Sequence, residues 1–390
     1  MKEYQRDLLA LIKNAMNGTE YGVSEEFDWE KAYRFAVSQQ LISLIYYGAL
    51  RCPGFKESGM QQTFSKTNAA NVSISERQLH AFGEIKEAFE KAGISFLPLK
   101  GACLKSMYPY PEMRAMSDLD IFIKTEEYDK IKDIMTEMGY TEGSESDHEL
   151  HWHNDRLCIE FHKRLIPSYN KDYYAYYRDG WAFAERIRDN SCEYTLKDEN
   201  FFIYIFTHFA KHYRDGGAGV KYVVDFYAFF KTHPNVDSEY IKTELRALGL
   251  DNFYENVVKL LKIWFGDEES DDISDFLTEK IFTRGVYGTK EDSVRSDGLK
   301  ISKKHKNAKL HKFFSVVFPS FSGMKTLYPI LKKLPFLLPF CWVIRWFKVL
   351  FTKNKNIKRE LTNLKKYDAG AIAEYEEELN FVGLDYNFKD

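Results

Sequence analysis

The sequence has few cysteines and no long apolar run. Its 390 residues include five Cys, and no two of them form a Cys-x-x-Cys pair. An odd, scattered set argues against a disulfide framework or a zinc finger. No run of 18 apolar residues is present that could span a membrane as a helix. The N-terminal stretch MKEYQRDLLALIKNAM is amphipathic and lacks the small-residue pattern of a signal peptide. Together these absences predict a cytoplasmic protein.

Acidic residues are almost missing from one part of the chain. Residues 300–366 contain 17 Lys and Arg and a single acid, Glu360, although the whole chain has a net charge of −3. Within this part, residues 313–351 mix Lys and Arg with Phe, Leu, Trp and Pro. One interpretation is a helical lobe whose apolar face packs on the core. Another is a surface that meets anionic lipid at the inner face of a membrane. Nucleic acid is the least favoured partner, because no binding motif accompanies the charge.

The periodicity of apolar residues divides the chain into four regions. Residues 1–93 have helical spacing, and residues 94–165 change to short apolar runs that predict strands between helices. Residues 166–285 return to helical spacing. Residues 286–390 predict a basic, aromatic-rich helical region, whose first part, 286–312, is polar and indicates a linker. The expected fold class is α+β, with a small mixed sheet embedded in a largely helical protein.

Two aspartates interrupt an apolar strand pattern. In DLDIFIK, residues 118–124, alternation places Asp118 and Asp120 on one strand face and the aliphatic residues on the other. The stretch ELHWHNDRLCIEFHK predicts a β-hairpin, and Glu160 and His162 share the polar face of its second arm. Carboxylates at positions i and i+2 can share a divalent cation such as Mg²⁺, and Glu160 is the natural third acid. A solvated acidic edge is the alternative.

A glycine follows the first predicted strand. Lys100 and Gly101, in PLKG, lie at a predicted turn from strand to helix. Glycine at such a turn lets backbone N–H groups approach a phosphate at the helix N-terminus.

These residues together resemble a known superfamily. PLKGACLKSMYPYPEMRAMSDLDIFI followed by IEFHKRL is similar to the DNA polymerase β-like nucleotidyltransferases, and more closely to a bacterial family of largely uncharacterised nucleotidyltransferases. The shared features are Leu-Lys-Gly, then Tyr-Pro, Arg and Ser-Asp-hydrophobic-Asp, then an acid-x-His pair. The helices on either side also resemble the family.

The resemblance implies roles position by position. Asp118, Asp120 and Glu160 would be the catalytic acids and would hold Mg²⁺ or Mn²⁺. Gly101 would seat the phosphates of a nucleoside triphosphate, with Ser117 and His162 beside it. Lys100 and Arg114 would offset phosphate charge. The sequence departs from the common pattern at Ala102, where Gly or Ser is usual, and in a longer gap before Asp118. Phosphate-loop geometry and substrate choice therefore stay open.

Several histidines and a glycine-rich stretch have alternative interpretations. His148, His151 and His153 could bind zinc, although exposed or stacked rings in a hairpin are the simpler interpretation. His162 could orient the site or the substrate, or cap its strand. His208 and His212 lie one helical turn apart, as zinc ligands can, but core packing is favoured because no Glu follows His208. DGGAG, from Asp215, reads as a turn between helices rather than a phosphate cradle.

The favoured function is a Mg²⁺-dependent transferase that moves a nucleotidyl group from a nucleoside triphosphate to an unidentified acceptor. A catalytically degenerate nucleotide-binding or regulatory module is the alternative. A third hypothesis is a membrane-peripheral accessory protein in surface-polymer or natural-product biosynthesis. The enzyme hypothesis predicts that Glu160 lies within about 6 Å of an aspartate carboxylate. It also predicts a raised pKa for all three acids when no cation is bound, because like charges oppose ionisation.

Overall fold

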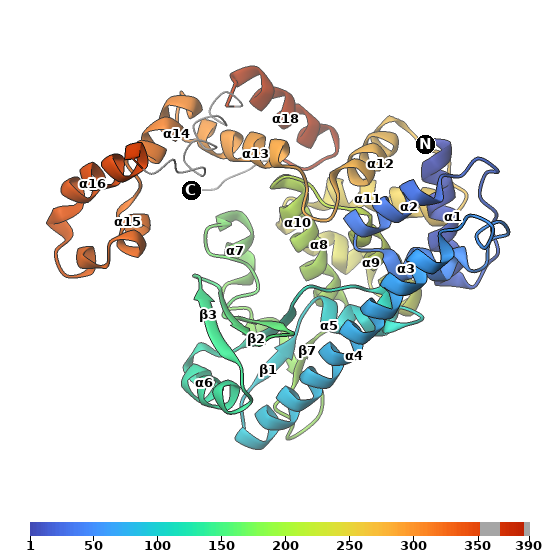
Figure 1. Ribbon diagram of the computed structural model, residues 1–390, viewed down its shortest axis with the longest axis horizontal. Coiled ribbons are helices and arrows are strands. Elements are labelled where there is room, and N and C mark those ends of the chain that lie inside the picture. Colours follow the sequence, from blue (N-terminus) through green and yellow to red (C-terminus); the bar gives the residue numbers. More distant parts are fainter. Residues whose placement is uncertain (352–366, 386–390) are drawn as a thin grey trace. The chain divides into compact units, whose positions relative to one another are not determined.

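The computed structural model describes residues 1–351 and 367–385 (Figure 1). Contacts within the chain divide it into two units. The first comprises Met1–His212, Ala218–Tyr287 and the C-terminal residues from Val382. The second comprises Tyr213–Gly217 and the chain from Gly288 to Phe381. The fold is α+β and largely helical, as the sequence predicts.

Helices make up most of the first unit. Before the sheet the helices are α1 (Glu3–Asn17), α2 (Trp29–Ser38), α3 (Ile42–Ala49) and α4 (Gln61–Ala92). After it come α8 (Asp198–Arg214), α9 (Val220–Thr232), α10 (Ser238–Ala247), α11 (Asp251–Phe265) and α12 (Asp272–Arg284). Phenylalanines fill the space between the later helices. Phe206 lies 5.5 Å from Phe226 and 5.7 Å from Phe253, measured between ring centres. This packing accounts for part of the high aromatic content, which is 16% of the chain.

A five-stranded mixed sheet lies between these two sets of helices in the sequence. Its strands are β1 (Phe96–Pro98), β2 (Leu119–Ile123), β3 (Thr141–Glu145), β4 (Glu149–His153) and β5 (Cys158–His162), in the spatial order β1-β2-β5-β4-β3. β2 and β5 are parallel, and the other neighbours are antiparallel. The short helix α5 (Gly101–Leu104) follows β1, and α6 (Tyr128–Glu137) follows β2. The predicted hairpin is β4–β5, whereas β3 was not predicted.

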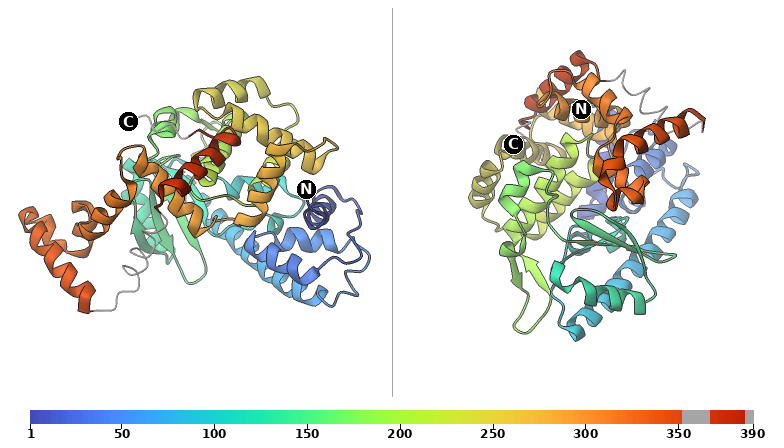
Figure 2. Two further views of the ribbon diagram at one scale, coloured as in Figure 1. Left: turned by 90° about the horizontal axis from the view of Figure 1, so that it is seen from above. Right: turned by 90° about the vertical axis from the view of Figure 1, so that its left-hand side faces the viewer.

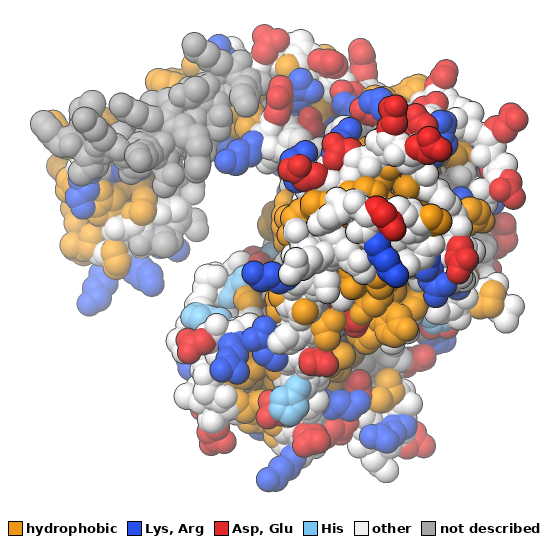
Figure 3. Space-filling view, turned by 45° about the vertical axis from the view of Figure 1, so that its right-hand side comes forward, with side chains coloured by type: hydrophobic (Ala, Val, Ile, Leu, Met, Phe, Trp, Pro, Cys, Tyr) orange, Lys and Arg blue, Asp and Glu red, His pale blue; other side chains and the backbone are white. Residues whose placement is uncertain are grey.

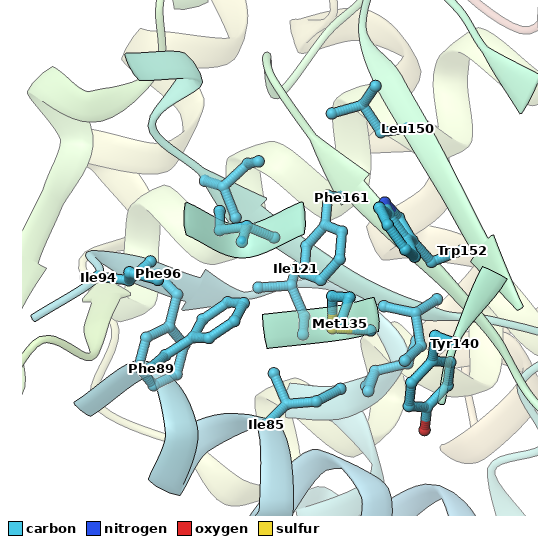
Figure 4. Close-up of a cluster of buried hydrophobic side chains, with 14 residues drawn as sticks. Ile85, Phe89, Ile94, Phe96, Ile121, Met135, Tyr140, Leu150, Trp152 and Phe161 are labelled. Carbon is cyan, nitrogen blue, oxygen red and sulfur yellow. The ribbon is translucent and has the colours of Figure 1, made fainter. Parts of the chain in front are cut away.

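The two faces of this sheet differ in polarity. Figure 4 shows the apolar face, where side chains from the strands pack on Ile85 and Phe89 of α4 and on Met135 of α6. Figures 1 and 2 show α4 running along this side of the sheet. Burial of this apolar surface fixes the register of the strands, because a slip of one residue would expose it. The residues that alternate with it face the other way and form the candidate site. Beyond the sheet the chain continues through α7 (Lys171–Tyr177) and a hairpin of β6 (Ala184–Arg186) and β7 (Tyr194–Leu196).

Among the described residues of the second unit, all regular secondary structure is helical. It contains α13 (Lys290–Ser302), α14 (Ala308–Val317), α15 (Phe321–Leu327), α16 (Leu338–Phe351) and α18 (Ala369–Phe381). The prediction of a linker over 286–312 is therefore wrong, because Thr289 caps α13 through its side chain and Asn307 caps α14. The basic residues within 352–366 lie outside the described residues. Among the described residues, no helix is both long and apolar enough to cross a membrane.

Candidate active site

The polar face of the sheet opens into a cavity of about 330 Å³. All eight residues predicted for the site line it: Lys100, Gly101, Arg114, Ser117, Asp118, Asp120, Glu160 and His162. They come from the turn after β1, the loop before β2, β2 itself and β5. Residues as far apart in the sequence as Lys100 and His162 therefore lie together at this cavity. Its volume falls at the lower end of the range of small-molecule sites.

The parallel pairing of β2 with β5 brings two acids together. Asp120 lies opposite Glu160 in the register of the two strands. Ligand atoms of Asp120, Glu160 and His162 all lie within 4.8 Å of one another. This confirms the predicted distance between Glu160 and an aspartate. Asp118 lines the same cavity but is not part of that closest group.

Asp120 contacts two neighbours through one carboxylate oxygen. Its Oδ1 accepts a hydrogen bond from Lys100 Nζ at 2.9 Å and lies 2.6 Å from His162 Nε2. Lys100 has a φ of 43°, a strained backbone conformation for a residue with a side chain. His162 is buried, and its Nδ1 has no hydrogen-bond partner among the described residues. A neutral His162 that donates from Nε2 to Asp120 fits both observations.

The acids respond differently to this environment. Burial and the charge of Asp120 raise the pKa of Asp118. Burial and the charges of Asp118 and Asp120 raise the pKa of Glu160 to about 8. Burial also opposes the charge of Asp120, but Lys100 and the hydrogen bond with His162 outweigh it and hold the pKa of Asp120 well below its usual range. The prediction of raised pKa values is thus wrong for Asp120, because it did not include these two partners.

Arg114 has a different environment from the one the sequence suggested. Its Nε and Nη2 donate to the two carboxylate oxygens of Asp225, both at 2.9 Å, and its Nη1 donates to the Ala115 carbonyl. The Tyr108 hydroxyl donates to the same Asp225 at 2.7 Å. All three side chains are buried. This geometry does not support the expectation that Arg114 offsets phosphate charge; the fork ties the loop before β2 to α9.

Two further predicted residues have specific packing. A side chain at Gly101 would meet the Met116 sulfur at 2.9 Å and Arg114 Nη1 at 3.3 Å, so any larger residue would require the Met116 side chain to shift. The helix that follows Gly101 has four residues, too few for the phosphate-binding helix that the sequence suggested. The Ser117 hydroxyl lies 2.9 Å from the Tyr287 hydroxyl at the edge of the cavity.

The cavity also contains residues from distant helices that sequence patterns did not connect with the acids. Lys221 of α9 is buried, donates to Gln40 Oε1 at 2.6 Å, and has a pKa lowered to about 7 by burial and by the Arg114 charge. His208 and His212 line the cavity with their Nε2 atoms 3.2 Å apart, and they also pack against the rings of Tyr204 and Tyr222, in agreement with the favoured core packing. Burial lowers the pKa of both rings, that of His212 to about 3. The sequences of α8 and α9 predict buried apolar helices, and the sequence alone does not show which face of each helix lies toward the acids.

The predicted histidine cluster contributes one ring to the acids. His151 Nδ1 lies 3.2 Å from Glu160 Oε1, and ligand atoms of His151, Cys158 and Glu160 lie within 4.8 Å of one another. His148 instead lies beside Glu149, with Nε2 2.9 Å from a carboxylate oxygen, and His153 is exposed. The three histidines therefore do not form one site.

The donor set of the cavity suits a hard divalent cation. Asp118, Asp120 and Glu160 offer carboxylate oxygens, which Mg²⁺ and Mn²⁺ prefer. Burial and mutual repulsion raise the pKa of two of them, and a bound cation would relieve that repulsion. The hydrogen bonds to Asp120 described above all end on Oδ1.

Comparison with known proteins gives one family match and one distant structural similarity. A model of a family described as uncharacterised nucleotidyltransferase matches residues 25–266. The chain belongs to this nucleotidyltransferase family. The matched part contains the sheet, the cavity acids and α9. Among solved structures, the solution structure of the antibiotic-resistance factor ANT(2'')-Ia is similar at 10% identity and a TM-score of 0.34, over 48% of this chain and 97% of that one. No curated protein matches the chain.

Proposed function

We propose that this member of the nucleotidyltransferase family transfers a nucleotidyl group from a nucleoside triphosphate to an acceptor, with Mg²⁺ or Mn²⁺ bound by Asp118, Asp120 and Glu160. The observation that supports it most is the register of β2 and β5, which aligns Asp120 with Glu160 on the face that lines the cavity. Membership of the family supports the reaction class. The identity of the acceptor stays open.

The reaction needs one bond to form and one to break. An acceptor oxygen bonds to the α-phosphorus, the bond from that phosphorus to the oxygen bridging to the β-phosphorus breaks, and pyrophosphate leaves. A bound cation would neutralise charge on the phosphate oxygens. We assign proton acceptance from the acceptor hydroxyl to Glu160, since its ionised carboxylate would lie beside Asp120 without a lysine partner among the ion pairs of the described residues.

Lysines that line the cavity complete the proposal. Lys221 and Lys211 lie there on α9 and α8 and can supply positive charge, whereas the guanidinium of Arg114 is paired with Asp225. A low pKa at Lys221 reflects burial beside Arg114, and an anionic triphosphate would favour its charged form. We therefore assign triphosphate binding to Lys221 in place of Arg114.

A nucleotide-binding module without turnover is a second candidate. The salt bridge from Lys100 to Asp120 favours it, because an internal ammonium already neutralises the acid that would hold a cation. Labelled nucleotides distinguish the two functions. The purified protein is incubated with a heat-treated bacterial extract as acceptor source and with nucleoside triphosphates labelled at the α- or the γ-phosphate.

Nucleotidyl transfer places the α-label on an acceptor and leaves the γ-label in the released pyrophosphate. Transfer of the γ-label would contradict the proposed reaction. Nucleotide binding without transfer of either label, across all four bases and both metals, would favour the binding module.

A further inference from the structure

The second unit exposes an unusual amount of apolar side chain. Of the 24 large apolar side chains exposed among the described residues, 13 lie between Leu310 and Phe347. Phe336 and Phe340 are 70% and 66% exposed. Soluble monomers rarely gather so many such side chains in one segment, and where they do, the surface meets a partner. We call residues 308–348 the apolar-basic segment.

The segment is folded, although it buries little of its apolar surface. Its internal core consists of Met324, Leu331 and Cys341, with Tyr328, Leu337, Leu338 and Trp342 packed against them. The indole N–H groups of Trp342 and Trp346 donate to the carbonyls of Pro319 and Val317 at 3.0 and 2.7 Å. These bonds hold α16 against the end of α14. The segment therefore has a fold of its own, and its remaining large apolar side chains are exposed to solvent.

Positive charge accompanies this apolar surface. The stretch from residue 308 to residue 348 contains seven Lys and Arg and no Asp or Glu. Figure 3 shows Lys and Arg beside hydrophobic side chains on this part of the chain. Two of the lysines lie over aromatic rings, Lys325 over Phe321 and Lys348 over Tyr328. A partner of this surface must offer an apolar environment for the exposed Phe, Leu and Ile side chains and negative charge for the Lys and Arg side chains.

We propose that the apolar-basic segment binds the surface of an anionic lipid bilayer. Acyl chains would receive the exposed Phe, Leu and Ile side chains, while lipid phosphates would receive the lysines and Arg345. A second copy of the same surface fits less well, because it would set cation against cation. Nucleic acid would pair with the lysines but would leave the aliphatic side chains without an apolar environment. The proposal does not depend on the proposed reaction.

Vesicle flotation tests this proposal on the full chain. Vesicles of phosphatidylcholine alone are compared with vesicles of phosphatidylcholine and phosphatidylglycerol. We expect preferential binding to the anionic vesicles, and weaker binding as salt is raised. Phe336→Ser with Phe340→Ser should weaken partitioning at least about tenfold, since two exposed rings lose their burial in lipid. Lys332→Gln with Lys333→Gln should weaken binding to anionic vesicles only.

Val37→Ser with Leu79→Ser is the matched control, because both side chains are exposed on helices of the first unit. This control should float like the unchanged protein. Failure to bind either vesicle would overturn the proposal, as would full binding by the double Phe variant. Two other results would also overturn it: dimerisation abolished by the Phe changes without vesicle binding, and binding of RNA or DNA in place of vesicles.

Discussion

Asp118 lies directly before β2 and Asp120 lies within it, yet their surroundings shift their pKa values in opposite directions. Asp120 has a lysine and a histidine on one oxygen, whereas Asp118 has burial and the neighbouring carboxylate. The sequence predicted the pair, its face and Glu160 beside it, because strand alternation and the hairpin pattern are local. It could not predict that Lys100 turns onto Asp120, since this depends on a strained backbone angle after β1.

The two aspartates should therefore respond differently to neutralisation. Asp118→Asn removes a repelled charge and should raise the melting temperature of the metal-free protein. Asp120→Asn leaves the ammonium of Lys100 without its carboxylate in a buried setting and should cost about 3 kcal/mol of unfolding free energy. Thermal and urea unfolding of both variants, measured without metal, checks this. Equal shifts in the same direction would contradict the assigned ion pair.

Glu160 predicts a pH dependence. Its pKa of about 8 in the folded protein lies above the value of about 4.3 for an unfolded chain, so the folded state holds the proton more tightly. Its contribution to stability is present below pH of about 4.3 and is lost as pH rises toward about 8. Metal binding should release a proton over the same window, and affinity for Mn²⁺ should increase with pH. Calorimetric titration in buffers of different ionisation enthalpy measures that proton.

Glu160→Gln is the matched comparison, because it keeps the size of the side chain and removes the titration. This variant should show a flatter dependence of Mn²⁺ affinity on pH. An unchanged proton release would assign the titration to another group.

At the scale of the elements, α9 supplies two side chains to the site region from more than 100 residues beyond Arg114. Asp225 accepts hydrogen bonds from Arg114 in the loop before β2, and Lys221 lines the cavity. The helical spacing over residues 166–285 predicted helices here, and α9 is one of them. The role of its two charged residues depends on which helix face meets the sheet, and hydrophobic periodicity alone does not supply that information.

The Arg114–Asp225 fork should be a structural contact. Arg114→Ala leaves the buried carboxylate of Asp225 unpaired and should destabilise the fold by about 3–5 kcal/mol. Replacing both partners, with Arg114→Met and Asp225→Leu, should cost less than replacing Arg114 alone. A double-mutant cycle of unfolding free energies measures the coupling. A large loss of nucleotide affinity in Arg114→Ala without loss of stability would restore the original prediction of phosphate binding.

Lys221 should show the complementary behaviour. Lys221→Met should weaken nucleoside triphosphate binding about 10- to 100-fold, as expected for a charge-assisted hydrogen bond, with a small effect on stability. Burial of the ammonium lowers its pKa, so removing it relieves a cost in the nucleotide-free protein. Nucleotide titration by fluorescence checks the affinity. Lys211→Met is a comparison on the neighbouring wall of the same cavity.

At the scale of the whole molecule, composition and periodicity predicted the class of fold and the place of the sheet among the helices. They were less informative in the C-terminal part, where polar residues around Lys290 resembled a linker but form the capped helix α13. Cap residues compensate there for a weak apolar pattern. That many Phe and Leu side chains of the second unit are exposed can be recognised only from the structure, because the sequence does not distinguish a buried aromatic residue from an exposed one.

The central claim is that the acids of β2 and β5 support metal-dependent nucleotidyl transfer. Pyrophosphate release is the most direct measurement, taken with a panel of nucleoside triphosphates, Mg²⁺ or Mn²⁺, and the heat-treated extract. We expect release by the unchanged protein and by Glu145→Gln, an exposed acid on β3. No release is expected without metal or from Asp118→Asn with Asp120→Asn. Full release by that double variant would contradict the account.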